Sequence, residues 1–227
     1  EDGSAMFRVP ANTPIAVQPL DAEGKAMQIM RSWLTAMPGE FLACVGCHEK
    51  QTDTASIRFH EAIARPVDEI TPWYGPTRGF GFDREVQPVL DKYCVSCHDG
   101  QKKDTGGELL PDFRKSDKKG WSNFTPSYLA LHRFVRRPGP ESDYHVQAPL
   151  EYHADGSELT QMLRKGHGRV QLDAEAWDRL ITWMDLNVPD RGTWGEERKV
   201  PGNVHQRRLE MAKTYAGLSD DPEAIVA

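Results

Sequence analysis

Two short stretches, Cys44-Val45-Gly46-Cys47-His48 and Cys94-Val95-Ser96-Cys97-His98, contain every cysteine of this 227-residue chain. Each has the spacing C-x-x-C-H, which is the attachment signal of c-type haem. The spacing has a chemical reason, because two thiols one helical turn apart can each add to a vinyl group at one edge of a porphyrin. The adjacent imidazole is then directed at the iron. The sequence therefore predicts two covalently bound haem c groups, with His48 and His98 as iron ligands.

Three other uses of paired cysteines explain the pattern less well. A zinc site has its second cysteine pair about 15 to 20 residues after the first. Here 46 residues, positions 48–93, separate the pairs, and zinc gives no reason for a histidine after both. A thioredoxin-like redox pair explains neither the duplication nor the histidines, and a disulfide within either pair closes only a small loop. Haem remains the prediction.

The composition narrows the class of protein. Hydrophobic residues make up 38% and charged residues 27% of the chain, as in one large or two small globular domains, and the 19 Gly and 16 Pro indicate many loops. The net charge of -6 gives no basic surface for nucleic acid. No apolar run approaches the roughly 18 residues of a membrane span. Because thioether attachment requires reduced thiols and an assembly machinery outside the cytoplasmic membrane, we expect a periplasmic or otherwise extracytoplasmic protein.

The pattern of apolar and turn residues predicts a mainly α, loop-rich fold with a small N-terminal antiparallel β portion. Residues 5–35 contain short alternating or β-branched runs separated by turns. Pro88 suits the first turn of a helix that runs into Cys94. Asp173 is the expected N-cap of a helix from Ala174 to about residue 186, whose apolar residues recur at helical spacing.

Four segments follow from these patterns. Residues 1–65 are expected to form a β-containing haem unit one, and residues 66–80 a linker rich in proline. Residues 81–195 are expected to form a cytochrome c-like haem unit two. Residues 196–227 form a tail with a charged surface helix.

The sixth iron ligand is usually His or Met. For haem two the first candidate is His167, because glycine on both sides lets the backbone approach a large flat cofactor. His153 and His145 follow in that order. For haem one, His60 is the only other histidine within its unit, and a haem without a protein ligand on that side remains open.

With these motifs in hand, the chain resembles the haem-bearing middle and C-terminal portions of the hydrazine synthase alpha subunit and its relatives. The resemblance covers nearly the whole chain. The matching stretches are residues 1–5, 7, 9–11, 30–33, 38–40, 44–49, 85–100, 177–180, 187–189, 192–194 and 220–223.

The resemblance implies separate roles for the two haems. In that family the middle-domain haem is catalytic, and the C-terminal haem has two histidine ligands and relays electrons. Haem one would then be the candidate reactive centre, and haem two a relay with His167 as its distal ligand. The family pattern has a tyrosine four residues after the first haem histidine, where this chain has Thr52, so hydrazine synthesis is in doubt. A β-propeller precedes these domains in the family, and its absence here implies a fragment of a larger polypeptide.

Two functions remain open at this point. The favoured one is an electron-transfer module that passes electrons between a partner enzyme or adjacent domain and an extracytoplasmic redox carrier, with the protein setting the haem potentials. The alternative is a hydrazine-synthase-like haem redox enzyme with an open site at haem one. Electron transfer is favoured because residues 44–52 offer no acid–base pair, and His60 with Glu61 is only a neighbouring pair. The oligomeric state is left open.

Overall fold

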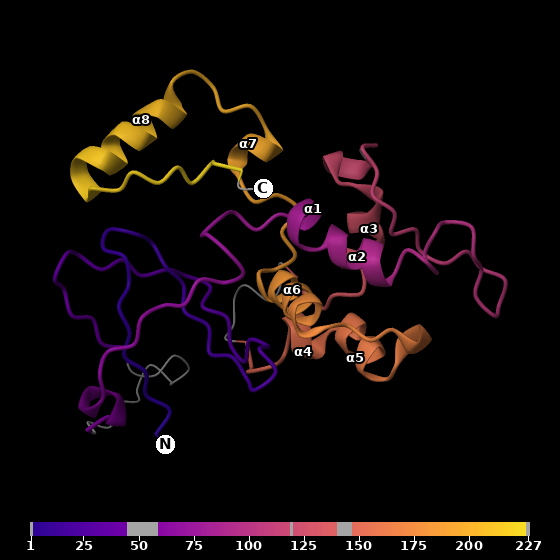
Figure 1. The fold of residues 1–227 in the computed structure, drawn as a ribbon, viewed down its shortest axis with the longest axis horizontal. Coiled ribbons are helices and arrows are strands. Elements are labelled where there is room, and N and C mark those ends of the chain that lie inside the picture. Colours follow the sequence, from indigo (N-terminus) through magenta and orange to yellow (C-terminus); the bar gives the residue numbers. More distant parts are fainter. Residues whose placement is uncertain (1, 45–58, 119, 140–146, 226–227) are drawn as a thin grey trace. The chain divides into compact units, whose positions relative to one another are not determined.

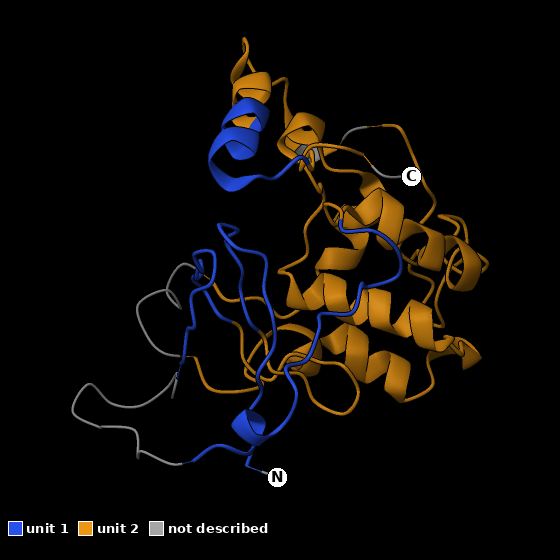
Figure 2. Cartoon of the chain, turned by 60° about the vertical axis from the view of Figure 1, so that its left-hand side comes forward, with its two compact units in different colours: residues 1–17, 30–77, 209–219 blue, residues 18–29, 78–208, 220–227 orange. Residues whose placement is uncertain are grey.

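A computed structural model describes residues 2–44, 59–118, 120–139 and 147–225, in which short helices are joined by long loops (Figure 1). The chain divides into two compact units, each made of segments that are separate in the sequence (Figure 2). Unit 1 consists of residues 1–17, 30–77 and 209–219, and unit 2 of residues 18–29, 78–208 and 220–227. The predicted division at residues 65, 80 and 195 stays a prediction.

Most helices belong to unit 2. These are α1 (Phe82–Glu85), α2 (Gln87–Tyr93), η2 (Trp121–Asn123), α3 (Pro126–His132), α4 (His153–Gly156), α5 (Glu158–Arg164), η4 (His167–Arg169), α6 (Ala174–Asp185) and α7 (Trp194–Glu197). Unit 1 contains the 3₁₀ turn η1 (Glu61–Ala64) and the π-helical turn η5 (Ala212–Ala216), and α8 (Val204–Met211) is shared between the two units. No helix in the described part of the chain is long and apolar enough to cross a bilayer.

The predicted fold class, mainly α with an N-terminal antiparallel portion, is wrong, because the described residues contain no sheet. The expected strands of residues 5–35 form only isolated bridges, such as the antiparallel pair of Ile15 and Leu34. Pro10, Pro14 and Pro19 lie in this region, and proline has no N–H to donate to a ladder. The alternating pattern of residues 5–35 therefore corresponds to single bridges and not to continuous strands.

Unit 2 is built around α6, which the sequence predicted correctly. The Asp173 side chain accepts a hydrogen bond from the N–H of Ala176, 2.8 Å away, and so caps the helix. The buried face of α6 includes Ile181 and Trp183, both fully buried. Around them lies one apolar core: Phe82, Val86, Val89, Leu90, Phe113, Tyr128, Leu131, Val135, Ala154, Leu159, Ala176, Leu180, Met184 and Val188.

Unit 1 has almost no apolar core among its described residues. Its buried apolar side chains are those of Ala36 and Ala62, which remove little surface from water. Its large apolar side chains are exposed instead, with Trp33 and Phe41 at 69% and Phe59 at 79% exposure. The described side chains of unit 1 therefore bury much less apolar surface than those of unit 2.

A buried acidic residue ties residues 18–29 to the helices of unit 2. Asp185, at the end of α6, accepts hydrogen bonds from the N–H groups of Ala26 (2.7 Å) and Ala154 (3.0 Å). Beside it, the buried Lys25 ammonium contacts Asp21 at 2.8 Å and Asp155 at 2.7 Å. Burial raises the pKa of Asp185 to about 6. This segment is thus held by polar contacts centred on one buried carboxyl group.

A second buried network joins α1 to α6. The Glu85 carboxylate is 2% exposed and receives two hydrogen bonds from Arg78, at 2.6 and 2.9 Å. Arg179 of α6 contacts the same carboxylate and also contacts Glu175 at 2.7 Å. Two guanidinium groups therefore share one buried acid at the point where the α1–α2 segment meets α6.

Candidate metal centre at His98

The second C-x-x-C-H stretch continues directly from α2. Pro88 lies in the first turn of this helix, as predicted, and Val89 and Leu90 are buried against the core. The helical hydrogen bonding carries on past Tyr93, since the Cys94 N–H donates to Leu90 O at 2.8 Å and the His98 N–H donates to Cys94 O at 2.9 Å. The motif is therefore presented as one further turn of helix.

Both thiols of this motif are free. Cys94 is partly buried and Cys97 is exposed, and the Cys97 N–H donates to Cys94 O at 3.0 Å, which sets the two residues one turn apart. Burial raises the pKa of the Cys94 thiol to about 11. Cys44 of the first motif is also free and exposed. The described cysteines thus have the unpaired state that thioether attachment needs.

His98 is held in a defined tautomer. Its imidazole is 9% exposed, and its Nδ1 lies 3.1 Å from Pro111 O. Because a carbonyl oxygen only accepts, Nδ1 carries the proton and Nε2 has the lone pair that a metal binds. Burial lowers the pKa of His98, which favours the neutral imidazole. The ring of Phe113 stacks on His98 with its centre 4.5 Å away.

The structure brings His167 to His98. Gly166 (φ +88°) and Gly168 (φ +56°) both adopt left-handed backbone and place the exposed His167 in the turn η4 after α5. The centres of the two imidazole rings lie 5.9 Å apart, and the ring planes differ by 27°. Two imidazoles bound to one metal ion through bonds of about 2 Å have ring centres about 6 Å apart. The two rings are thus near-parallel, at a separation that leaves room for one metal ion between them.

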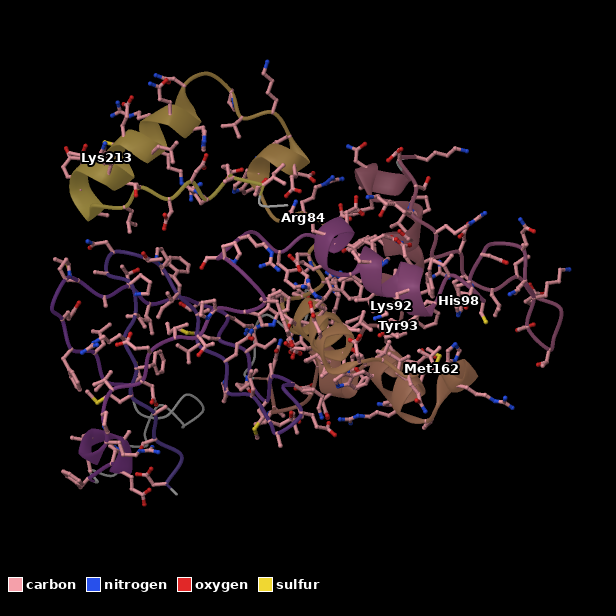
Figure 3. The ribbon with its side chains drawn as sticks, viewed as in Figure 1. Arg84, Lys92, Tyr93, His98, Met162 and Lys213 are labelled. Carbon is pink, nitrogen blue, oxygen red and sulfur yellow. The ribbon has the colours of Figure 1, made fainter. Side chains whose placement is uncertain are left out.

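The end of α2 is fixed to the start of α6 by a charged contact beside this site. Tyr93 donates its hydroxyl proton to Asp173 Oδ2 at 2.7 Å, and the Lys92 ammonium reaches the same oxygen at 3.0 Å. Figure 3 places Lys92 and Tyr93 at the end of α2 next to His98. These contacts, led by the Tyr93 hydrogen bond, hold the pKa of Asp173 well below its usual range. Tyr93, the residue before Cys94, is thereby fixed to the start of α6.

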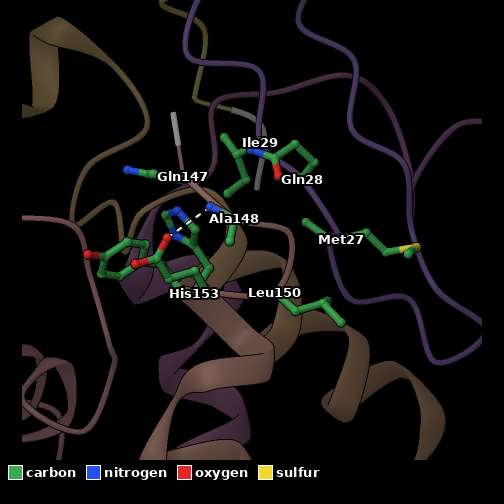
Figure 4. A pocket seen from close by; sticks show the side chains of 10 residues that line it. Met27, Gln28, Ile29, Gln147, Ala148, Leu150 and His153 are labelled. Atoms are coloured by element: carbon green, nitrogen blue, oxygen red, sulfur yellow. Dashed lines mark hydrogen bonds between the residues drawn. The ribbon is translucent and has the colours of Figure 1, made fainter. Parts of the chain in front are cut away.

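The other candidate histidines lie elsewhere or are not described. His153 is buried at the start of α4, has φ +64°, and its Nδ1 lies 3.3 Å from Met184 O. It lines a small hollow together with Gln147 (Figure 4). His60 lies in unit 1, with its Nδ1 3.7 Å from Asp2 Oδ2. His48, Cys47, Thr52 and His145 fall outside the described residues.

Three contributors to the His98 site had no signal in the local sequence. Pro111 supplies the acceptor for Nδ1, Phe113 supplies the stacked ring, and Gln87 holds the Phe113 carbonyl with a 2.8 Å hydrogen bond. All three act across the fold rather than along the chain.

The residues present fit a covalently attached haem. Two free thiols one turn apart and a histidine with its Nε2 available are the groups that a c-type haem attaches to, and a second imidazole lies 5.9 Å from the first. In the described part of the chain, no group of three or more His, Cys, Asp or Glu side chains is arranged to hold a metal ion by itself.

Part of the chain is similar to a known protein family. Residues 1–49 match the family model described as the hydrazine synthase alpha subunit middle domain, a stretch that includes the whole first C-x-x-C-H motif. No curated protein and no solved structure matches the chain significantly. The first fifth of the chain is therefore similar to a domain of the hydrazine synthase alpha subunit.

Proposed function

We propose that this chain is a c-type cytochrome domain that transfers electrons between a partner enzyme or adjacent domain and an extracytoplasmic redox carrier. The observation that carries the proposal is the neighbouring, near-parallel pair of imidazoles. His98 has its tautomer fixed by Pro111 O, and the ring centre of His167 lies 5.9 Å away. A haem attached at Cys94 and Cys97 accounts for this pair together with the free thiols.

Each side chain of the proposed haem site in unit 2 has a separate role. A bound haem supplies a one-electron iron couple. Cys94 and Cys97 anchor one edge of it, and His98 presents Nε2 because Pro111 O holds its other nitrogen. His98 and His167 would both hold the iron of such a haem, which would leave its iron without a site for a substrate and supports electron transfer rather than catalysis at this site.

For the first motif we propose the same attachment, through Cys44, Cys47 and His48, with His60 as the candidate distal ligand. The resemblance of residues 1–49 to a hydrazine synthase domain supports this part of the proposal. The exposed Trp33 and Phe41, which precede the motif in the sequence, support it as well, because a large apolar cofactor could cover such side chains. Extracytoplasmic localisation follows from thioether attachment and is proposed with it.

The haem content tests the proposal directly. The chain is produced in a host that matures cytochromes, and haem per chain is measured as the pyridine haemochrome. We expect two haems, and one fewer after the double substitution Cys94→Ala and Cys97→Ala. Colourless protein, or a mass equal to that of the bare polypeptide, contradicts the proposal.

The ligand assignment has its own test. His167→Ala should convert the haem at His98 from low-spin to high-spin. His132→Ala is the matched control, because the His132 Nδ1 lies 3.0 Å from Leu129 O on its own helix. An unchanged spectrum in His167→Ala contradicts the role of His167 and transfers it to His153 or His145.

A second candidate function is a haem redox enzyme with an open site at haem one. It is favoured by the match of residues 1–49 to a domain of an enzyme subunit. Adding carbon monoxide or nitric oxide to the reduced protein separates the two functions. Two haems that ignore both gases exclude the enzyme, and one responsive haem excludes a purely electron-transferring protein.

A further inference from the structure

Gln87 is a buried amide with an unusually complete set of partners. Its side chain is 1% exposed at the start of α2. Its Oε1 accepts a hydrogen bond from the Ser127 hydroxyl at 2.7 Å, and its Nε2 donates to Asp91 Oδ1 and to Phe113 O, both at 2.8 Å. Both N–H groups of the amide are therefore used, which fixes its orientation.

The carbonyl that Gln87 holds belongs to the segment around His98. The Phe113 N–H donates to His98 O at 3.0 Å, and the Phe113 ring stacks on the imidazole at 4.5 Å. Two residues earlier, Pro111 O accepts the Nδ1 proton of His98 at 3.1 Å. Residues 111–113 thus contact the backbone, the ring face and the ring nitrogen of His98. Gln87 contacts the same segment through the Phe113 carbonyl.

We propose that Gln87 is a positioning residue for the metal centre at His98. By holding Phe113 O it keeps residues 111–113 in place, and so keeps Pro111 O aligned with Nδ1 of His98. This inference rests on the proposed function of the site. Neither α2 nor α3 requires an amide here for its own hydrogen bonding, because the Gln87 side chain bonds to other side chains and to a loop carbonyl.

The consequence is a control on the iron potential. A hydrogen bond from Nδ1 makes Nε2 a more basic ligand, and this second-shell contact tunes the metal. A more basic imidazole stabilises ferric iron over ferrous iron and lowers the reduction potential. Loss of the Gln87 contact should therefore weaken the His98 to Pro111 hydrogen bond and raise the potential of this haem.

The test measures both haem potentials in the haem-loaded chain by optical redox titration. The component altered by His167→Ala identifies the haem at His98. Gln87→Met keeps the length of the side chain and removes all three hydrogen bonds, and we expect it to raise the potential of that component only. The matched control is Gln161→Met, which changes an exposed glutamine on α5 and should leave both potentials unchanged.

A purely structural role is separated by a second variant. Gln87→Met leaves the buried Ser127 hydroxyl without its acceptor, which costs stability. Adding Ser127→Ala removes that unsatisfied group, so the double variant should recover part of the stability but keep the raised potential. A potential that returns to the wild-type value along with stability overturns the positioning role.

A third measurement covers the case in which Gln87→Met does not fold. Ser127→Ala alone removes one of the three Gln87 contacts and should raise the same potential by a smaller amount. If Gln87→Met does not fold, an unchanged potential in Ser127→Ala overturns the inference. If Gln87→Met folds, an unchanged potential in that variant overturns it directly. Failure of the proposed function looks different, because the haemochrome assay then finds no haem at Cys94 and Cys97 in the wild-type chain.

Discussion

Replacing Glu85 by glutamine is expected to destabilise unit 2 strongly. The substitution keeps the shape of the side chain and removes its charge. Arg78 and Arg179 then lose the acid that they share, and their own side chains are only 12% and 18% exposed. Water solvates such buried groups poorly. The two guanidinium groups are therefore left close together without the negative charge that offset their repulsion.

The expected size follows from the burial of the network. Removing one partner of a buried ion pair costs about 3 to 5 kcal/mol, because a charge is left in a poorly solvated place. An exposed ion pair contributes about 0.2 to 1 kcal/mol. Glu175 provides that comparison within the same network, because it contacts the same Arg179 but its side chain is 52% exposed. The test therefore compares the loss of unfolding free energy in Glu85→Gln with the loss in Glu175→Gln.

Urea unfolding of the haem-loaded protein at pH 7, followed by circular dichroism, measures both variants. Glu85→Gln should lower the free energy of unfolding by several times as much as Glu175→Gln. Raising the salt concentration should reduce the Glu175 effect and leave the Glu85 effect nearly unchanged, since buried charges are poorly screened. Equal losses for the two variants, or a loss below about 1 kcal/mol for Glu85→Gln, would refute the reasoning.

Three further predictions concern unit 2. Folding raises the pKa of Asp185 from 3.8 to about 6, so the folded state binds this proton more tightly than the unfolded state does. The stabilisation is complete below pH 3.8 and is lost as the pH rises through 6, on the order of 3 kcal/mol. The free energy of unfolding, measured from below pH 3.8 to above pH 6, should fall with rising pH in the wild type. The same decrease should be absent in Asp185→Asn, which has no proton to release. Leu90→Ala, at a side chain 1% exposed, should cost about 2 to 5 kcal/mol in thermal unfolding. The same change at Leu109, which is 61% exposed, should cost far less. Gly166→Ala meets no atom within 4 Å but must adopt φ +88°, so it should lower stability by about 1 kcal/mol and shift the spectrum of the His98 haem through His167; an unaltered spectrum and melting temperature would contradict this.

The sequence predicted those parts of unit 2 that depend on local chemistry. Pro88 and Asp173 marked the beginnings of α2 and α6, because a missing N–H and a capping carboxylate act within one turn. The glycines beside His167 likewise marked a sharp turn. The approach of that turn to His98 needed the three-dimensional fold, since 68 residues, positions 99–166, separate the two histidines.

The failures have a different physical origin. Residues 5–35 alternate as strands do, but a strand forms only where a partner can accept and donate along its length, and the prolines interrupt this. Gln87 and Pro111 could not be identified in advance because their roles come from contacts with distant segments. A periodic pattern describes which side chains share a face, and it does not say which carbonyl an amide will reach.

The interleaving of the two units along the chain limits how the protein can be dissected. Residues 18–29 belong to unit 2, although unit 1 contributes the segments on either side of them. A fragment beginning at residue 78 would lack Lys25 and the Ala26 N–H that meets Asp185. A fragment ending at residue 49, the length of the matched stretch, would lack Asp68, the bridge partner of Phe7. Conventional truncation at a linker would thus damage both halves, and an engineered separation calls for circular permutation or for co-expression of complementary pieces.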